Sequence, residues 1–492
     1  MAVIRPGVSA FILAIYGLMG LVYAVLTPAW QVPDEPAHYN YVHYVATVHR
    51  FPELVSGCYD HVYLTELKSR RFPPELPIAP VCYEFHQPPL YYLLATPIFI
   101  LSNGSLLVIR LVSVALGAGI IYLAGAITLT IFHDNAQIAY GTMALVAFVP
   151  MHLAILASVN NDALAELLFA IVLLLLVRWL LSPERPSIRS AGLVGLFLGL
   201  GLITKTTVYT AGPLVVIALS LRAYLDYSRG QGGAGAYLIR LAAISYGLAL
   251  LIALPWFARN VIVYGGVDIL GLARHDRVVV GQLRTADFVT QNGMAAYLGD
   301  LVSTTFQSFW GQFGWMAVPM DPRTYLLLAL LSGLALVGVG ISAWTGQISR
   351  ASWSQKAGLL LMGVAIGLVV LAYLGYNLAF VQFQGRYLFP GLIPLGLFFS
   401  LGLNEVLQPR WRWWLAGGLL LMLSSVGVIS GLNGQIDKWT LLILGLALLL
   451  TAARALLPAY ETRVSSALWL ACYGGLGWLA LAAPFWFVVP YL

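Results

Sequence analysis

Two carboxylates stand side by side directly after the first long apolar run, at Asp34 and Glu35. A helix start would explain one of them, because a carboxylate often caps a helix and Pro36 fits a first helical turn. A cap needs one carboxylate, whereas a general base needs a carboxylate within reach of the proton that it removes. We therefore take both as candidate catalytic residues, and the helix cap is the alternative.

Polar residues recur at two further points along the chain. Glu84, His86 and Gln87 precede paired prolines, a pattern that a loop re-entering an interfacial helix would also produce. Asp162 follows two asparagines where one apolar run ends and the next begins. It could cap the following helix, but it would then lie at the same membrane level as Asp34. Asp162 is the third candidate catalytic carboxylate.

Four cations stand at the ends of apolar runs, and they are Arg110, Lys205, Arg259 and Arg386. Any one of them could extend its charge to the lipid headgroups. Cations at or within membrane spans are nevertheless costly and are functional candidates by default. Several of them at one depth, facing carboxylates, are what the binding of a lipid phosphate requires.

Carboxylates and cations in this arrangement fit one class of reaction. When a sugar leaves a polyprenyl phosphate, the acceptor hydroxyl must lose a proton, so one carboxylate is needed as general base. The departing phosphate is already anionic and needs positive charge rather than an acid catalyst. A glycosidase would instead need two opposed carboxyl groups. The sequence offers one candidate base and a cluster of cations, which is the set that such a transfer would need.

Membrane-spanning helices must position these residues. The chain has 492 residues, 60% hydrophobic and 9% charged, with a mean hydropathy of +0.85. So few charges could not cover a soluble domain of this size. The first apolar run lacks a cleavage site and is expected to be retained. Runs of about 20 apolar residues predict a single all-α transmembrane domain over 1–492 with about thirteen spans, near 8–29, 106–132, 136–156, 162–181, 190–207, 209–225, 240–263, 324–345, 357–378, 387–407, 411–431, 438–456 and 466–489.

Positive charges predict the orientation of these spans. Of the 26 Lys and Arg, seven lie in two long loops, where charge has little influence on topology. Of the others, 13 lie on the side of the N-terminus and six on the opposite side. The N-terminus is therefore expected inside and the long loops outside. The six are Arg110, Lys205, Arg259, Arg323, Arg386 and Lys438.

The two long loops are residues 30–105 and 264–323. We expect juxtamembrane helices in the first outer loop, and the aromatic end of the second, at 306–315, is expected to lie in the membrane interface. Cys58 and Cys82 share the first loop. They are expected to form a disulfide if the loop faces an oxidising compartment, and two free thiols are the alternative.

Taken in order, these motifs resemble bacterial members of the GT-C glycosyltransferase superfamily. The motifs are Pro33 to Pro36, His86 to Tyr92, Arg110 to Ser113, Asn161 with Asp162, Lys205, Pro255 to Asn260, and Gln384 to Tyr387. They look most similar to the protein O-mannosyltransferase-like and aminoarabinose transferase-like branch, over most of residues 20–390. The resemblance implies a GT-C-like fold and inverting transfer of a sugar from a polyprenyl-phosphate donor to an acceptor hydroxyl on the outer membrane face.

Roles for individual residues follow from the same resemblance. Asp34 maps onto the catalytic base, with Glu35 beside it, and Asp162 onto a carboxylate that helps to bind acceptor or donor. Related aminoarabinose transferases have Lys before the paired prolines, where this chain has Gln87, so either His86 or Lys205 is expected to contact the phosphate instead. The other candidates for the donor phosphate are Lys205, Arg259 and Arg386. The candidates for substrate binding are Gln87, Tyr91, Tyr39 and Arg110.

Two other functions stay open. A polysaccharide polymerase or ligase also uses lipid-linked substrates, but it would rely on arginines and histidine in late loops. A transporter would place its site near the midplane, often between repeated halves.

The expected partners are a polyprenyl-phosphate-linked sugar, an acceptor glycan, lipid or protein, and the bilayer of the bacterial cytoplasmic membrane. The net charge of +6 requires no nucleic acid. A divalent metal, Mg or Mn, is an open question, since Asp34, Glu35, Asp162 and His86 could ligate one.

Overall fold

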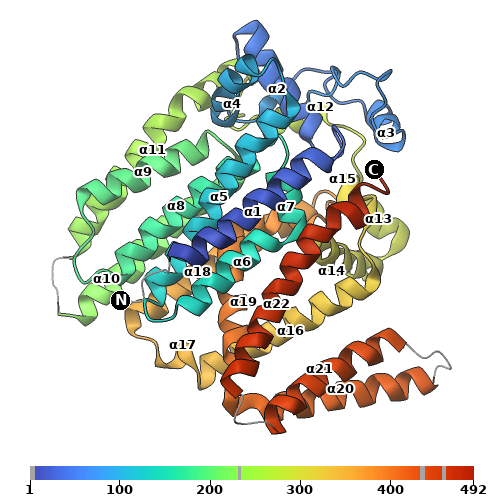
Figure 1. Ribbon diagram of the computed structural model, residues 1–492. Helices are drawn as coiled ribbons and strands as arrows, with labels where there is room; N and C mark the ends of the chain where they lie inside the picture. Colours follow the sequence, from blue (N-terminus) through green and yellow to red (C-terminus); the bar gives the residue numbers. More distant parts are fainter. Residues whose placement is uncertain (1–5, 231–233, 433–437, 457–460) are drawn as a thin grey trace.

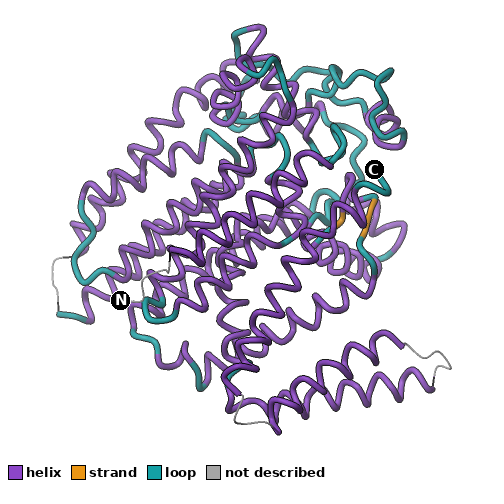
Figure 2. Tube along the Cα trace, in the orientation of Figure 1, coloured by secondary structure: helices purple, strands orange, loops and turns teal. Residues whose placement is uncertain are grey.

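The computed structural model describes residues 6–230, 234–432, 438–456 and 461–492. Helices make up most of these residues (Figure 2), and within the described ranges β1 (Val318–Pro319) is the one strand. The predicted all-α polytopic membrane fold is confirmed.

Ten helical segments in the described part of the chain are long and apolar enough to cross a membrane. They are built from α1 (Pro6–Leu26), α5 (Leu106–Ile131), α8 (Asp162–Leu181), α10 (Ala211–Ser228), α11 (Ala234–Tyr264), α16 (Pro322–Trp344), α18 (Trp353–Asn377), α19 (Leu392–Val406), α20 (Arg412–Leu432) and α22 (Glu461–Ala483). Short turns adjoin five of them, namely η2 (Thr206–Thr210) before α10, α17 (Gln347–Arg350) after α16, η3 (Gly385–Gly391) before α19, η4 (Pro409–Trp411) before α20 and η6 (Pro484–Val488) after α22.

An eleventh candidate span is bent. Its two parts, α6 (Ala136–Phe148) and α7 (Pro150–Leu156), meet at an angle of 64°. Pro150 is the first residue of α7, and Val149 before it has an extended backbone. A proline lacks the N–H that would continue the helix and disfavours helical backbone in the preceding residue, so the bend follows from the sequence.

The expected number of thirteen spans is not confirmed. Each predicted segment is helical, but α9 (Ile188–Leu202) has only 15 residues. A helix of that length rises about 22 Å, whereas the hydrocarbon core of a bilayer is about 30 Å thick. The other exception is α21 (Lys438–Leu456), which packs against α20 and is not among the ten.

The two long loops lie toward the end of the bundle at the upper right of Figure 1. The first loop contains α2 (Glu35–Val48), α3 (His61–Ser69), η1 (Tyr83–His86) and α4 (Leu90–Leu101), so the helices expected there are confirmed. The second contains α12 (Leu272–Val278), α13 (Thr285–Asn292), α14 (Met294–Trp310), α15 (Phe313–Met316) and β1. The aromatic stretch predicted at 306–315 is the end of α14 together with the start of α15.

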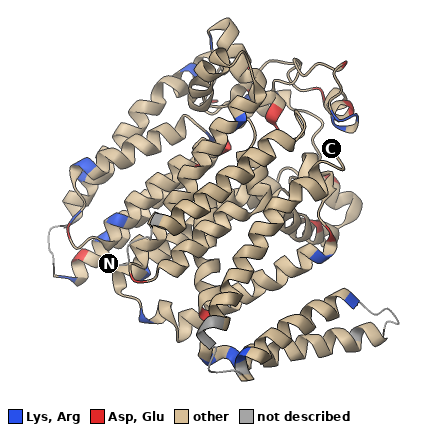
Figure 3. Cartoon of the chain, in the orientation of Figure 1, with Lys and Arg blue, Asp and Glu red and all other residues tan. Residues whose placement is uncertain are grey.

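Charged side chains are sparse along the helices and gather toward their ends and in the loops (Figure 3). Those enclosed by the bundle have partners. Arg222 donates to Asp226 with 2.8 Å between Nε and Oδ1, and both side chains are fully buried. His152 Nε2 lies 2.9 Å from Oε2 of Glu166, and both are also buried. This pairing is what a low-dielectric interior requires of an ionised group.

One helix crossing holds the later half of the bundle in place. A Cβ at Gly338 in α16 would lie 2.0 Å from the backbone oxygen of Gly402 in α19, and a Cβ at Gly402 would lie 2.0 Å from that of Ala335. Small residues at such crossings let helix backbones pack closely in a membrane. The crossing fixes α19 and, directly before it, η3, which carries Arg386.

We expect Gly338→Ala to lower the free energy of unfolding by about 1–3 kcal/mol, because the added methyl group would clash with backbone atoms of α19, which cannot change rotamer as a side chain can. Thermal unfolding in detergent micelles measures the loss. Gly340→Ala is the matched control, since nothing lies within 4 Å of a Cβ at that position. Equal losses in the two variants would show that the crossing does not depend on glycine.

Candidate active site

Asp34 lies between α1 and α2, and its carboxylate faces residues from two distant segments. Oδ1 accepts a hydrogen bond of 2.6 Å from the hydroxyl of Tyr83, and Oδ2 accepts one of 2.5 Å from Nη2 of Arg386. The backbone of Asp34 is left-handed, with φ 67°, a conformation that costs a residue other than glycine about 1–3 kcal/mol. Its side chain makes no cap bond to α2, so the helix-cap alternative does not hold for Asp34.

These contacts keep Asp34 ionised. Burial acts to raise the pKa of its carboxyl group, but Arg386, Tyr83 and the nearby His38 outweigh burial and lower the pKa to about 2. An opposite charge and a hydrogen-bond donor both favour the carboxylate form. Asp34 is therefore a carboxylate at any pH at which a cell works.

Asp162 and Lys205 form a second ion pair. Nζ of Lys205 lies 2.6 Å from Oδ1 of Asp162, and both side chains are partly exposed. Asp162 is the first residue of α8, and Lys205 directly precedes η2. Asn161 joins the two segments, because its Nδ2 donates to the carbonyl oxygen of Thr204 at 3.2 Å. Each ion pair thus combines a predicted catalytic carboxylate with a predicted phosphate-binding cation.

His38, on α2, lies within electrostatic reach of both ion pairs. Burial lowers the pKa of its imidazole, and Lys205 lowers it further, whereas Asp34 and Asp162 act in the opposite direction. Nδ1 of His38 lies 2.8 Å from the hydroxyl oxygen of Tyr92. His38 therefore lies near both ion pairs.

A polar cavity of about 270 Å³ opens beside Asp34 and Arg386. Its lining comes from both long loops, from the end of α18 and from η3. The residues are Pro33, Asp34, Tyr59, Leu64, Lys68, Tyr83, Glu84, His275, Gln282, Trp315, Met316, Tyr376, Gln382, Gln384, Arg386 and Tyr387.

Most of the cavity wall was not predicted from the sequence. Tyr83 precedes Glu84 in a motif that we did single out, but no spacing rule links it to Asp34. Lys68 lies 5.5 Å from the ring centroid of Trp315, which donates from its indole N–H to the carbonyl oxygen of Trp30 at 2.9 Å. The second long loop thereby folds over the first, and only tertiary structure brings Trp315 to Asp34.

Glu35 and Arg110, which were predicted to act in catalysis and in substrate binding, bind each other. Nε and Nη2 of Arg110 donate to the two carboxylate oxygens of Glu35 at 2.7 and 2.6 Å. Arg110 also donates to three backbone carbonyls at the end of α1. Glu35 is fully buried and accepts two backbone N–H groups as well, from Trp30 and Val159. Both side chains are buried, and the pair anchors the first loop to the bundle.

Arg259 and His86, which were predicted to bind the donor phosphate, also have protein partners. Nη2 of Arg259 donates to the carbonyl oxygen of Pro52 at 2.5 Å, and its guanidinium stacks on Trp256 and Tyr264. Nδ1 of His86 lies 3.0 Å from the carbonyl oxygen of Tyr83. Burial lowers the pKa of His86 to about 3, with a further contribution from His275, so its imidazole is neutral. Neither residue lines the cavity.

The residues predicted to bind substrate are spread over the site's surroundings. Gln87 is the one nearest an ion pair, since Asn161 donates to its Oε1 at 3.4 Å. Tyr91 lies 3.3 Å from Ser113 Oγ, and Tyr39 donates to the carbonyl oxygen of Gly104 at 2.7 Å. These contacts tie α2 and α4 to their neighbours. None of the three lines the cavity.

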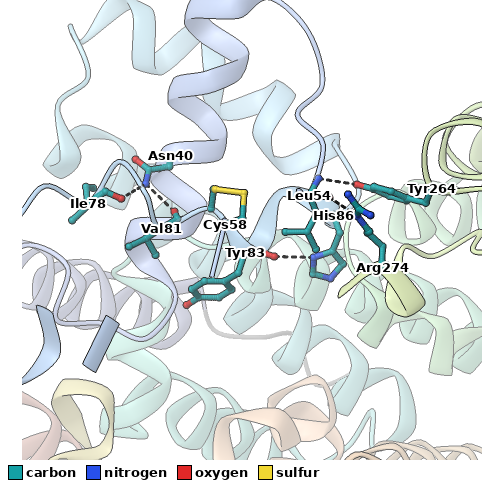
Figure 4. The surroundings of a disulfide bond; sticks show 10 residues. Asn40, Leu54, Cys58, Ile78, Val81, Tyr83, His86, Tyr264 and Arg274 are labelled. Carbon is teal, nitrogen blue, oxygen red and sulfur yellow. Dashed lines mark hydrogen bonds between the residues drawn. A yellow bond between two sulfur atoms is a disulfide. The ribbon is translucent and has the colours of Figure 1, made fainter. Parts of the chain in front are cut away.

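The disulfide predicted between Cys58 and Cys82 is present, and Figure 4 shows it beside Tyr83. Asn40 on α2 holds the same stretch of loop by donating to the carbonyl oxygens of Ile78 and Val81. Because Cys82 directly precedes Tyr83, the disulfide restricts the segment whose hydroxyl group binds Asp34. Among the described residues, no group of three or more His, Cys, Asp or Glu is placed to hold a metal ion.

We expect Arg110→Ala to lower the free energy of unfolding by about 3–5 kcal/mol, because it leaves the buried Glu35 without a countercharge. Arg323→Ala is the matched control, since Arg323 is half exposed and lies 4.0 Å from Asp321. Its loss should cost about 1 kcal/mol or less. Thermal unfolding of both variants measures the difference, and an Arg110 variant as stable as the Arg323 variant would contradict the anchoring role.

Comparison with known proteins gives a family and a fold. A family model described as a predicted membrane protein (DUF2142) matches residues 84–396, which is more than half of the chain. No curated protein matches the sequence significantly.

Solved structures of low sequence identity share the architecture. ArnT from Cupriavidus metallidurans bound to undecaprenyl phosphate has a TM-score of 0.53 at 14% identity, over 98% of this chain and 78% of ArnT. The apo state of ArnT has a TM-score of 0.53 at 15% identity, over 96% of this chain and 76% of ArnT. The Archaeoglobus fulgidus oligosaccharyltransferase, tethered with an acceptor peptide, has a TM-score of 0.50 at 15% identity. The match covers 94% of this chain and 55% of the oligosaccharyltransferase. The chain therefore belongs to the DUF2142 family of membrane proteins and shares its fold with the ArnT and oligosaccharyltransferase structures.

Proposed function

We propose that this protein is an inverting glycosyltransferase, which moves a sugar from a polyprenyl-phosphate donor to an acceptor hydroxyl. The observation that carries the proposal is the Asp34–Arg386 pair, an ionised carboxylate and a cation that line one cavity where spanning helices end. The solved structure of ArnT with undecaprenyl phosphate supports a lipid phosphate as ligand of this fold.

The proposed reaction divides its work between the two kinds of group. Asp34 removes the proton of the acceptor hydroxyl as the acceptor oxygen forms its bond to the anomeric carbon. The bond from that carbon to the phosphate oxygen breaks, and the electron pair leaves with the polyprenyl phosphate. Arg386 and Lys205 stabilise the negative charge that grows on the phosphate.

The position of the site argues against a transporter. Asp34 follows the end of α1, Asp162 begins α8, and Tyr376 is the last residue but one of α18. A transporter would place such groups near the midplane of the membrane, whereas these lie at helix ends.

We also propose that the cavity faces the outer side of the membrane. The Cys58–Cys82 disulfide lies in the loop that lines the cavity, and disulfides persist in oxidising compartments. The excess of Lys and Arg in the short loops of the other side agrees with this orientation.

Asp34→Asn tests the proposed base directly. We expect transfer from a polyprenyl-phosphate sugar to fall by about 10²–10⁴-fold, because asparagine cannot accept the proton. The protein should still insert, because asparagine keeps a side-chain oxygen that can accept a hydrogen bond at this position. Asp300→Asn, an exposed position on α14, should leave transfer unchanged. Full turnover by the Asp34 variant would exclude Asp34 as the base.

Lys205 is a cation of the proposed phosphate site, whereas Arg259 lies outside it, so variants of the two can be compared. We expect Lys205→Met to weaken the binding of polyprenyl phosphate about 10–100-fold, the contribution of one charge-assisted hydrogen bond. Arg259→Met should change affinity by less than about threefold, because its guanidinium is bound to Pro52, Tyr264 and Trp256. Binding to protein in lipid nanodiscs measures both. Equal losses of affinity in the two variants would show that Arg259 also contributes to phosphate binding.

A further inference from the structure

Arg386 already has a carboxylate partner at the position where the donor phosphate would need it. Nη2 donates to Asp34 at 2.5 Å, and Nε donates to Oε1 of Gln384 at 2.7 Å. The guanidinium carbon lies 5.3 Å from the ring centroid of Tyr387. The arginine is nine-tenths buried, so it is held in place from several sides and cannot swing out to meet a ligand.

A phosphate that enters the cavity therefore competes with Asp34 for one fixed cation. Both are oxyanions, and both prefer the same fork of N–H donors. Asp34 is the more exposed partner, with 22% of its side chain accessible against 7% for Arg386. The carboxylate can thus yield while the guanidinium stays.

We propose that Arg386 is shared in turn between Asp34 and the donor phosphate, so that Asp34 becomes an effective base only when a donor is bound. This inference rests on the proposed function and concerns the control of the same site. Without a donor, Arg386 and Tyr83 hold the carboxylate as a weak base. When the phosphate takes over Nη2, Asp34 loses its main countercharge and is left facing the acceptor.

The direction of the pKa shift agrees with this geometry. Arg386 is the largest of the influences that lower the pKa of Asp34. Removing that influence leaves burial, which raises the pKa of a carboxyl group. A stronger base then accepts the acceptor proton more readily. The left-handed backbone of Asp34 is strained, as is common in residues whose side chains must be held in a functional position.

Competition for Arg386 predicts that a variant unable to catalyse transfer binds lipid phosphate more tightly than the wild type. In Asp34→Asn the guanidinium has no anionic partner, so polyprenyl phosphate should bind about tenfold more tightly. The probe is polyprenyl phosphate itself, titrated into wild-type and variant proteins in nanodiscs without acceptor. Asp34→Ser carries the same expectation if the asparagine variant does not fold.

A double-mutant cycle separates this exchange from simple charge repulsion. Repulsion between Asp34 and the phosphate would persist without Arg386, so Asp34→Asn would then tighten binding in an Arg386→Gln background as well. Exchange requires Arg386, so the gain should fall below about twofold in that background. Asp300→Asn is the control, because Asp300 is an exposed residue of α14. It should change the affinity for polyprenyl phosphate in neither background.

The outcomes are distinct. A gain in Asp34→Asn that disappears in Arg386→Gln supports the exchange. Equal or weaker binding by Asp34→Asn, or an equal gain in both backgrounds, overturns it and leaves the proposed transferase standing. Failure of the wild type and every variant to bind polyprenyl phosphate overturns the proposed function and this inference with it.

Discussion

An ionised group cannot stay in the hydrocarbon region of a membrane without a partner, and this constraint orders the whole structure. Glu35 is enclosed with Arg110, and Arg222 with Asp226. His152 shows how strictly the rule applies. Its Nδ1 faces the carbonyl oxygen of Val146, which only accepts hydrogen bonds, so Nδ1 must carry a proton. Its Nε2 lies 2.9 Å from Oε2 of Glu166, so both ring nitrogens have a partner inside the bundle.

The same constraint gives two adjacent residues opposite roles. Glu35 is the first residue of α2 and points into the bundle, where Arg110 and backbone groups occupy every oxygen. Asp34, one residue earlier, has a left-handed backbone and points the other way, toward Tyr83 and Arg386 at the cavity. The buried pair fixes the start of α2, and that fixed start places Asp34. A structural ion pair therefore positions the candidate base.

The sequence predicted the membrane fold and the residues of both ion pairs, because a charge at the end of an apolar run is costly and so is conspicuous. It did not predict which charges pair with each other. Arg110 and Arg386 look alike in the sequence, yet one binds Glu35 inside the bundle and the other Asp34 at the cavity. The sequence did not predict that Trp315 and Lys68 line the cavity with Asp34, because they do so only once the second loop has folded over the first. The count of thirteen spans is not confirmed at α9 and α21, and the shortness of α9 is not evident from an apolar run that ends at Lys205.

The two ion pairs also explain how charge would move in the proposed reaction. Asp34 with Arg386, which line the cavity, and Asp162 with Lys205, which lie outside its lining, each combine one negative and one positive side chain. A donor phosphodiester adds one negative charge. As the acceptor proton reaches Asp34, the carboxylate loses its charge and the departing phosphate gains one, so the total stays constant while its location shifts. Arg386 contacts Asp34 and is fixed by Gln384 and Tyr387. A fixed cation between the two anions stabilises the charge at the beginning and at the end of the transfer without moving, and such a preorganised group costs no reorganisation when the reaction occurs.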